Sequence, residues 1–318
     1  PACVDFVLTP ETLAGPGAPP DTPHADPDAE CYLAFTSGSS GPPKCVAHSA
    51  NTILANTRDM VQDWAHVAGT RMLTLSPLSH HIAWVAAGQW LDCGCELIVN
   101  DPPAGTSQFD WLLETGATYV MGVPTHAMDI LAEQRRRGLD RLGAVEIFYM
   151  AGSPIPAAVA EAFSEQGIVP QNVYGMTENS SHQYTHPDDD FAISTSTCGR
   201  GGPAYEVRIF DAENSDREVA VGERGQIAGR GAALMLGYLG DAKANRNAGG
   251  WFLSGDLGVL DERGNLSIVG RLKDLIIRGG RNIAPAHIEA LAVRHDDVEK
   301  AAAFPVPDAR LGEKVCLA

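Results

Sequence analysis

The sequence lacks any apolar run of the roughly 18 residues that a membrane-spanning helix needs, and it does not open on a basic segment followed by an apolar one. We therefore predict neither a transmembrane span nor a secretory signal, and we expect a cytoplasmic protein. Basic residues are also few: 23 lysines and arginines stand against 40 aspartates and glutamates, for a formal net charge of −17. Such an excess of negative charge repels nucleic acids and anionic membranes, so we expect neither as a partner.

Cysteine is scarce and scattered, with seven in 318 residues. An odd number without regular spacing does not form a disulfide framework in a chain of this length. Cys93 and Cys95 are separated by a single glycine, but no second close pair and no histidine stand at ligand spacing. We interpret these two residues as buried thiols rather than as a metal site.

Hydrophobic residues make up 44% of the chain, which is enough to bury a full core. Residues 1–30 are rich in proline and have no periodic apolar face, so we predict a loose lead-in without chemistry. In residues 31–185 short apolar runs alternate with segments of helical period, which indicates an α/β fold with a layered parallel sheet and helices. The expected strands are residues 32–35, 71–75, 96–99, 118–121, 145–150 and 172–174.

The clearest helix is predicted after the first strand. Ser49 is placed to cap it, and Ile53, Met60, Trp64 and Val67 recur on one face. This apolar face is expected to pack on the sheet.

The pattern changes after residue 185. Residues 186–272 contain short alternating strands, at 205–210, 226–229 and 266–269, and predict a small antiparallel, β-barrel-like subdomain. Residues 273–318 predict the start of a small α+β C-terminal domain, with a helix near Pro285 and a strand at 301–304. Because the chain opens on Pro1 instead of methionine and stops within the apolar run 315–318, we expect it to be truncated at both ends.

A loop suited to polyphosphate follows the first strand. Residues 36–44 read Thr-Ser-Gly-Ser-Ser-Gly-Pro-Pro-Lys. Glycines let backbone N–H groups turn onto an anion, hydroxyls donate further hydrogen bonds, and Lys44 supplies a positive charge. The spacing is not that of a Walker loop. Taken alone, the segment is equally compatible with a flexible loop of serine and glycine.

A second motif, Tyr174-Gly175-Met176-Thr177-Glu178, follows a predicted strand. At a strand end, an aromatic ring suits stacking on a flat base and a hydroxyl suits hydrogen bonding to a phosphate. The carboxylate of Glu178 suits Mg²⁺, which prefers oxygen ligands. Without the phosphate loop, the same five residues are equally compatible with an ordinary turn.

Together these segments resemble the adenylate-forming superfamily of acyl-CoA synthetases, luciferases and peptide-synthetase adenylation domains, and they are closest to an acyl-CoA ligase. The phosphate loop is similar to the form Tyr-Thr-Ser-Gly-Ser-Thr-Gly-x-Pro-Lys-Gly, with Ser40 in place of threonine and Cys45 in place of the glycine after the lysine. Further segments match in the family's order: residues 151–154, 251–256, 270–274 and 279–285.

The resemblance implies a site for ATP or AMP with Mg²⁺, in which Asp256 holds the ribose hydroxyls and Glu178 the metal ion. The implied cofactor-binding residues are Thr36, Ser37, Gly38, Ser39, Ser40, Gly41, Lys44, Gly152, Ser153, Asn172, Tyr174, Gly175, Thr177, Asp256 and Arg271. The implied catalytic residues are Thr177, Glu178, Lys44 and His80. Lys273 would be the hinge between domains, and Gly279 and Gly280 would border the tunnel for coenzyme A.

Residues 77–80 are similar to the family motif Pro-x-x-His, whose imidazole lies beside the acid. The resemblance implies an acid pocket lined by His80, His81, Ile82, Val123, Tyr149, Ala151 and Val173. None of these is an aspartate or glutamate, and an amino acid would leave its ammonium group buried without a partner. The wall is expected to be apolar, which favours an aromatic, alicyclic or medium-chain carboxylic acid.

The implied reaction is ATP-dependent formation of an acyl-AMP, followed by transfer of the acyl group to coenzyme A. One alternative is a ligase that loads the phosphopantetheine thiol of a carrier protein, although like-charged surfaces disfavour an acidic carrier. The other is a nucleotide-binding homologue without catalysis. In the family, a lysine near the C-terminus completes the adenylation site. No residue of this chain is assigned that role.

Overall fold

The computed structural model describes residues 26–36, 43–241, 244–279, 281–295, 297–298 and 300–318. Its largest sheet has six strands in the order β4-β3-β5-β6-β7-β8. Strands β3 to β7 pair in parallel, and β8 runs antiparallel to β7. The strands are β3 (Arg71–Thr74), β4 (Glu96–Val99), β5 (Tyr119–Gly122), β6 (Ile147–Ala151), β7 (Val169–Met176) and β8 (Ser180–Tyr184). The predicted parallel sheet is confirmed.

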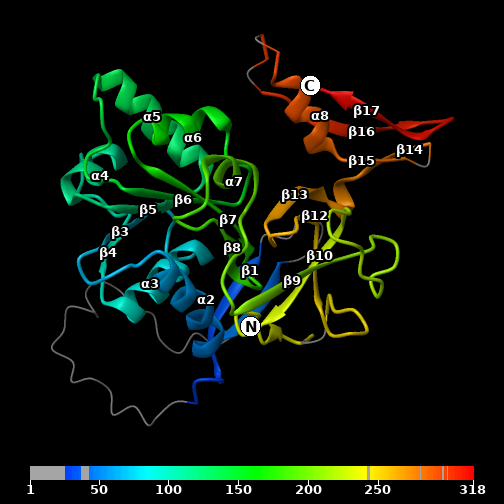
Figure 1. Ribbon diagram of the computed structural model, residues 1–318, viewed down its shortest axis with the longest axis horizontal. Helices are drawn as coiled ribbons and strands as arrows, with labels where there is room; N and C mark the ends of the chain where they lie inside the picture. The colour runs from blue at the N-terminus through cyan, green and yellow to red at the C-terminus, as the bar shows by residue number, and fades with distance from the viewer. Residues whose placement is uncertain (1–25, 37–42, 242–243, 280, 296, 299) are drawn as a thin grey trace.

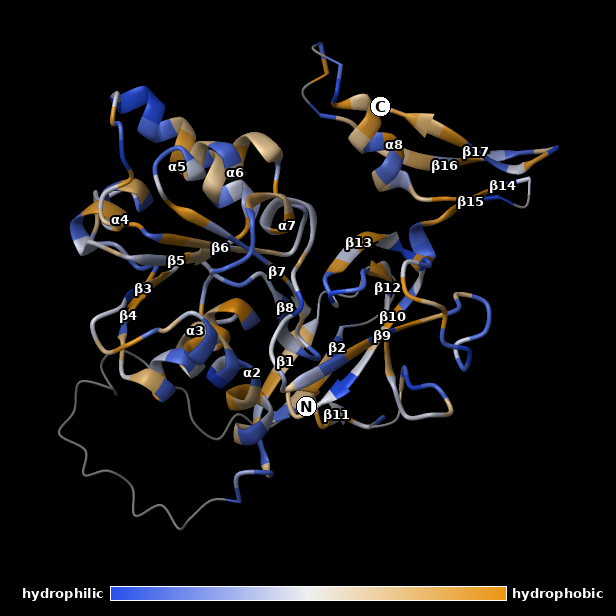
Figure 2. Ribbon diagram, viewed as in Figure 1, coloured by the Kyte–Doolittle hydropathy of each residue, from blue (hydrophilic) through white to orange (hydrophobic). Residues whose placement is uncertain are grey.

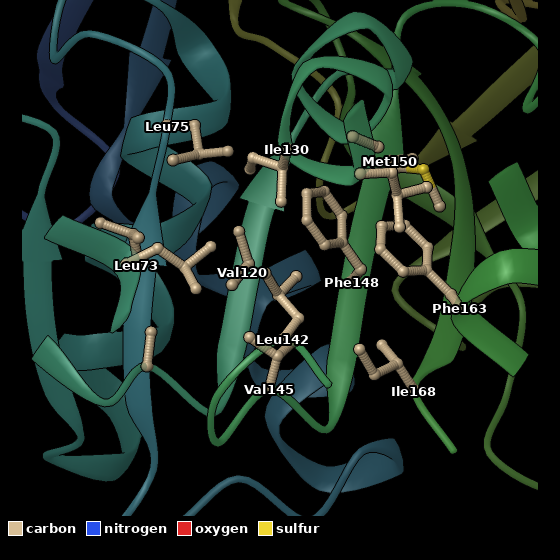
Figure 3. Close-up of a cluster of buried hydrophobic side chains, with 14 of the residues drawn as sticks. Leu73, Leu75, Val120, Ile130, Leu142, Val145, Phe148, Met150, Phe163 and Ile168 are labelled. Atoms are coloured by element: carbon tan, nitrogen blue, oxygen red, sulfur yellow. The ribbon is translucent and has the colours of Figure 1, made fainter. Parts of the chain in front are cut away.

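Helices cover both faces of this sheet (Figure 1). Parallel strands require crossover connections, and these connections place helices on the two faces. On one face lie α2 (Ala50–Asp63) and α3 (His81–Cys93), and on the other lie α4 (Gln108–Thr115), α5 (Pro124–Arg137) and α6 (Ala157–Ser164). In Figure 3, Leu73, Val120 and Phe148 of the strands face Ile130 of α5 and Phe163 of α6.

The start of α2 follows the predicted cap. The Ser49 side chain accepts a hydrogen bond from the Thr52 backbone N–H at 3.3 Å, and the Thr52 hydroxyl accepts one from the Ser49 N–H at 3.0 Å. This reciprocal pair satisfies two N–H groups that a helix end leaves free.

The first predicted strand does not belong to the parallel sheet, which corrects that expectation. Strand β1 (Glu30–Thr36) pairs antiparallel with β2 (Lys44–Ser49), and β2 pairs with β11 (Gly237–Tyr238). No strand was predicted between Lys44 and the helix cap at Ser49, so β2 was missed. An antiparallel pair needs only a turn between its strands, so the loop after Thr36 closes a hairpin in which Thr36 and Lys44 are direct partners.

A second sheet is wholly antiparallel, as predicted for this region. Its order is β13 (Leu266–Arg271), β12 (Phe252–Leu260), β10 (Gly225–Gly231) and β9 (Tyr205–Phe210), and α7 (Phe191–Ser196) precedes it. Figure 2 shows hydrophobic residues gathered in β3, β5 and β6 of the first sheet, between the two helix layers.

The last part of the chain forms a third unit of strands and a helix. After the 3₁₀ turn η1 (Leu272–Asp274) come β14 (Ile276–Arg278), β15 (Arg281–Ile283), α8 (Pro285–Ala292), β16 (Ala303–Asp308) and β17 (Gly312–Leu317). Strand β17 pairs with β16 from Gly312 to Leu317. The helix predicted near Pro285 is confirmed. Among the helices of the described ranges, none combines the length and apolar content required to cross a bilayer.

Candidate nucleotide and acid site

The tight turn between β7 and β8 carries the second predicted motif. A Cβ atom on Gly175 would lie 1.7 Å from the carbonyl oxygen of Ser180, closer than atoms can approach. Only glycine therefore lets the two strands meet at this point, where the register of β7 and β8 shifts between Tyr174 and Met176. The turn places Thr177 and Glu178 at the carboxyl end of β7, the usual position for a ligand in an open α/β sheet.

Three predicted nucleotide residues from separate strands meet beside this turn. The hydroxyl of Tyr174 donates to Oδ2 of Asp256 at 2.8 Å, and Nε of Arg271 lies 3.1 Å from Oδ1 of the same carboxylate. Asp256 and Arg271 are cross-strand partners on β12 and β13. Burial raises the pKa of Asp256, and its bonds to Tyr174 and Arg271 act in the opposite direction. The two contacts hold the carboxylate in one orientation on strand β12 of the second sheet.

A second set of contacts surrounds Glu178, which is 8% exposed. Its Oε1 accepts a hydrogen bond from the hydroxyl of Tyr238 at 2.7 Å. The Nζ atom of Lys44 lies 4.6 Å from the centre of the Tyr238 ring. Tyr238 thus joins the lysine that ends the phosphate loop to the predicted metal ligand.

Sequence reasoning did not single out Tyr238. In the sequence, Tyr238 is marked only by the glycine before it. It reaches the site because β11 pairs with β2, and these two strands are far apart in the chain.

His48 is a further residue that the sequence analysis missed. Its Nε2 lies 2.6 Å from the carbonyl oxygen of Thr177, and its Nδ1 lies 2.9 Å from the hydroxyl of Thr52. Burial lowers the pKa of His48, so the ring is neutral near pH 7. With Nε2–H donating to the carbonyl oxygen of Thr177, Nδ1 accepts from Thr52. This bridge ties the Thr177 turn to strand β2 and helix α2.

The segment after β6 lies beside the same sheet edge. Gly152 has a φ of +91°, which favours glycine, and both Gly152 and Ser153 are exposed. Asn172 of β7 is buried, and its carbonyl oxygen accepts from the N–H of Thr185 at 3.1 Å. Gly152 and Ser153 are accessible to a ligand, and the predicted roles of all three residues stay predictions.

The predicted acid-pocket residues come together between α3 and the sheet. Ile82, Tyr149, Ala151 and Val173 belong to one buried cluster, against which Val123 packs. His81 is buried beside them.

Two polar contacts stand among the apolar side chains of this wall. Nε2 of His81 lies 2.9 Å from the hydroxyl of Ser180, and the hydroxyl of Tyr149 lies 2.7 Å from that of Ser181. Neither serine was predicted, because each joins the wall only through a contact between segments that are far apart in the chain.

The two histidines at the start of α3 have different roles in the fold. His80 is the N-cap, and its Nδ1 accepts from the N–H of Ile82 at 3.3 Å. Burial lowers the pKa of His81 to about 3, with smaller effects from His48 and His80. Burial also lowers the pKa of His80. Both rings are therefore neutral near pH 7.

The donor set fits a magnesium ion that arrives with phosphates. Within the described ranges, no three His, Cys, Asp or Glu side chains are grouped to hold a metal by themselves. Mg²⁺ is commonly bound by one or two carboxylates together with substrate phosphates and water. Glu178, beside Lys44 and Thr177, meets that requirement with a single carboxylate.

The remaining predicted residues lie in the third unit or outside the described residues. Lys273 is exposed within η1, between the second sheet and the third unit. Gly279 has a φ of +58° at the turn after β14. The predicted residues outside the described ranges are Ser37, Gly38, Ser39, Ser40, Gly41 and Gly280.

A parallel sheet covered on both faces, an adjoining antiparallel sheet and ordered motifs at their junction define a protein of the adenylate-forming class. Residues 4–239 match the family described as "AMP-binding enzyme", and the chain belongs to that family.

The chain is 33% identical over 309 residues to a feruloyl-CoA synthase of an Amycolatopsis species, covering 95% of this chain and 62% of that protein. It is 30% identical over 304 residues to the medium-chain fatty-acid–CoA ligase of Escherichia coli K12, covering 93% and 52%. The ATP-bound crystal structure of MatB from Rhodopseudomonas palustris superposes with a TM-score of 0.81 at 28% identity, covering 92% of this chain and 58% of that one. The chain therefore spans little more than half the length of these relatives.

Proposed function

We propose that the protein containing this chain is an AMP-forming acid–thiol ligase, which activates a carboxylic acid with ATP and transfers the acyl group to coenzyme A. The observation that carries the proposal is the line of contacts along the end of β7. It runs from Lys44 through Tyr238 to Glu178 at one end of the motif, and from Tyr174 to Asp256 at the other. A nucleotide lying on this line has its phosphates near Lys44 and its ribose near Asp256.

In the first step, a carboxylate oxygen of the acid attacks the α-phosphorus of ATP, and pyrophosphate leaves. Catalysis of such a step is mainly positioning and neutralisation of the charge on phosphoryl oxygens. Lys44 supplies positive charge and Thr177 a hydroxyl, while Glu178 would hold Mg²⁺, which neutralises further charge on the phosphates. In the second step, the thiol of coenzyme A attacks the acyl carbonyl, and AMP leaves.

The acid would lie between α3 and strands β6 to β8, with its carboxylate toward His80. Feruloyl-CoA synthase and medium-chain fatty-acid–CoA ligase are among the relatives. An aromatic, alicyclic or medium-chain acid agrees with the predominantly apolar cluster of this wall. An α-amino acid is disfavoured because no carboxylate stands among the predicted pocket residues.

The test uses the full-length protein that contains this chain, a panel of carboxylic acids, ATP, Mg²⁺ and free coenzyme A. We expect acid-dependent release of AMP and formation of a thioester that saturates with free coenzyme A. Glu178→Gln is expected to lower the rate of AMP release by about 100-fold or more, because it removes the charge that faces the metal ion. The matched variant Glu161→Gln changes an exposed glutamate on α6 and is expected to retain the activity.

Two results would contradict the proposal. Absence of AMP release with every acid would argue for nucleotide binding without catalysis. Thioester formation on the phosphopantetheine of a carrier protein, but not on free coenzyme A, would show that the acceptor is a carrier protein.

A further inference from the structure

Tyr238 stands between the two charged side chains of the candidate phosphate site. The ammonium group of Lys44 rests over the face of its ring, with Nζ 4.6 Å from the ring centre. The hydroxyl at the tip of the same side chain donates to Oε1 of Glu178 at 2.7 Å. Among the residues that the structure describes, Lys44 and Glu178 form no ion pair with each other. Each charge therefore has the tyrosine as its partner instead of the opposite charge.

The strand that carries Tyr238 is fixed to the strand that carries Lys44. Tyr238 is 6% exposed and belongs to a buried cluster with Phe252. The backbone N–H of Leu239 donates to the carbonyl oxygen of Cys45 at 2.8 Å, and Cys45 directly follows Lys44. The position of the ring relative to the base of the lysine side chain is thus set by the pairing of β11 with β2.

The segment before Tyr238 also holds the main chain of Glu178. The carbonyl oxygen of Glu178 accepts a hydrogen bond from the N–H of Met235 at 2.8 Å. One short segment therefore binds both the backbone and the carboxylate of the glutamate. A free glutamate side chain samples many rotamers, and fixing it before a ligand arrives removes that cost from binding.

Asn245 orients the tyrosine hydroxyl. Nδ2 of Asn245 lies 3.4 Å from the hydroxyl oxygen of Tyr238. An amide nitrogen only donates, so it takes a lone pair of the oxygen and leaves the hydroxyl proton for Glu178. Burial raises the pKa of Tyr238 well above its ordinary value, so the hydroxyl keeps this proton.

The hydroxyl engages only one of the two carboxylate oxygens. Among the described residues, none donates a hydrogen bond to Oε2 of Glu178. This oxygen is therefore the one left for Mg²⁺. Because Mg²⁺ accepts little deviation from octahedral geometry, the direction in which a single carboxylate oxygen points affects how well the ion is held.

We propose that Tyr238 is a positioning residue of the nucleotide site: its hydroxyl turns Glu178 toward Mg²⁺, and its ring keeps Lys44 free of the carboxylate and ready for phosphate. This inference rests on the proposed function, in which Lys44 and Glu178 bind the phosphates and the metal ion. The two parts of the side chain have separate tasks, so substitutions separate them.

The test measures the dissociation constant of ATP by calorimetry, with the full-length protein, once with Mg²⁺ and once with EDTA. The ratio of the two constants is the magnesium effect. Tyr238→Phe keeps the ring under Lys44 and removes the hydroxyl. We expect the magnesium effect to fall at least about fivefold, because a hydrogen bond to a charged group is lost. The constant in EDTA is expected to change less than about twofold, which also shows that the variant is folded.

Tyr238→Leu removes the ring as well as the hydroxyl. Lys44 and Glu178 can then pair with each other, and the dissociation constant of ATP is expected to rise at least about threefold even in EDTA.

Tyr184→Phe is the matched control. The Tyr184 hydroxyl also donates to a carboxylate, Oδ2 of Asp63, at 2.7 Å, between β8 and α2. This control is expected to keep both dissociation constants within about twofold.

A double-mutant cycle tests whether Tyr238 acts through Glu178. In the Glu178→Gln protein the metal-binding carboxylate is gone, so adding Tyr238→Phe is expected to change the magnesium effect by less than about 1.5-fold. A general disturbance of the fold would instead reduce the magnesium effect by the same factor in both backgrounds.

The outcomes separate this inference from the proposed function. A magnesium effect in Tyr238→Phe that equals or exceeds that of the unmodified protein would overturn the inference, as would equal losses with and without Glu178. Either result leaves the metal role of Glu178 standing. If the unmodified protein binds ATP equally well with Mg²⁺ and with EDTA, the metal role of Glu178 in the proposed function fails, and the inference fails with it.

Discussion

At the scale of single residues, buried histidines are the most distinctive groups of this protein. Burial lowers the pKa of His66 to about 4 and that of His81 and His182 to about 3. Both ring nitrogens of His182 have no hydrogen-bond partner in the described ranges, and the ring lies between Tyr174 and Tyr205. These rings are neutral in the folded protein, whereas the same side chains titrate near pH 6.5 when the chain unfolds.

We predict a steep loss of stability between pH 7 and pH 5. In this range the unfolded state binds protons on His66, His81 and His182 and the folded state does not, so acid favours unfolding. Each histidine contributes a loss of about 2 kcal/mol at pH 5, or roughly 6 kcal/mol for the three. The loss is measured as the difference between the free energies of unfolding in urea at pH 7 and pH 5.

The variant His182→Phe keeps an aromatic ring, breaks no protein hydrogen bond found in the described ranges, and is expected to remove about 2 kcal/mol of the acid effect. His287→Phe makes the same substitution at an exposed histidine and serves as the control. An unfolding free energy that is equal at pH 7 and pH 5 would contradict this account.

At the scale of elements, the hairpin of β7 and β8 positions most of the candidate site. It carries Tyr174 toward Asp256, Glu178 toward Tyr238, and Ser180 toward His81. The close approach at Gly175 is the feature that allows this arrangement.

Substitution of Gly175 tests the role of the hairpin. Gly175→Ala is expected to lower the free energy of unfolding by at least about 2 kcal/mol, since its Cβ meets a backbone carbonyl that cannot move aside. Denaturant unfolding measures this loss. Gly69→Ala is the matched control, because a Cβ at Gly69 meets nothing within 4 Å, and a change within about 0.5 kcal/mol is expected. A variant of Gly175 as stable as the control would show that the strands separate easily.

The sequence predicted elements well where a local pattern carried them. The parallel strands, the Ser49 cap and the helix at Pro285 follow from periodicity, capping residues and proline at a helix start. Strand β2 was missed because it is short and because its second partner, β11, lies about 190 residues further along the chain.

Long-range contacts limited the prediction of the site in the same way. The motifs named Glu178 and Asp256, but Tyr238, His48, Ser180 and Ser181 join the site only through tertiary contacts.

At the scale of the whole molecule, the candidate site lies where the parallel sheet, the β1–β2 hairpin and the second antiparallel sheet adjoin (Figure 1). Lys44 comes from the hairpin, Glu178 from the parallel sheet and Asp256 from the second sheet. The account requires that one nucleotide contact all three parts at once.

The most direct measurement of this claim is the dissociation constant of ATP and of AMP, by calorimetry, for the full-length protein and two variants. Lys44→Ala is expected to raise the dissociation constant of ATP at least about tenfold and that of AMP less than about threefold, because AMP lacks the terminal phosphates. Asp256→Asn is expected to raise the dissociation constants of both nucleotides by a similar factor of about ten or more, because both carry the ribose. If Asp256→Asn left both affinities unchanged, or if Lys44→Ala weakened AMP as much as ATP, the two residues would not hold opposite ends of one nucleotide.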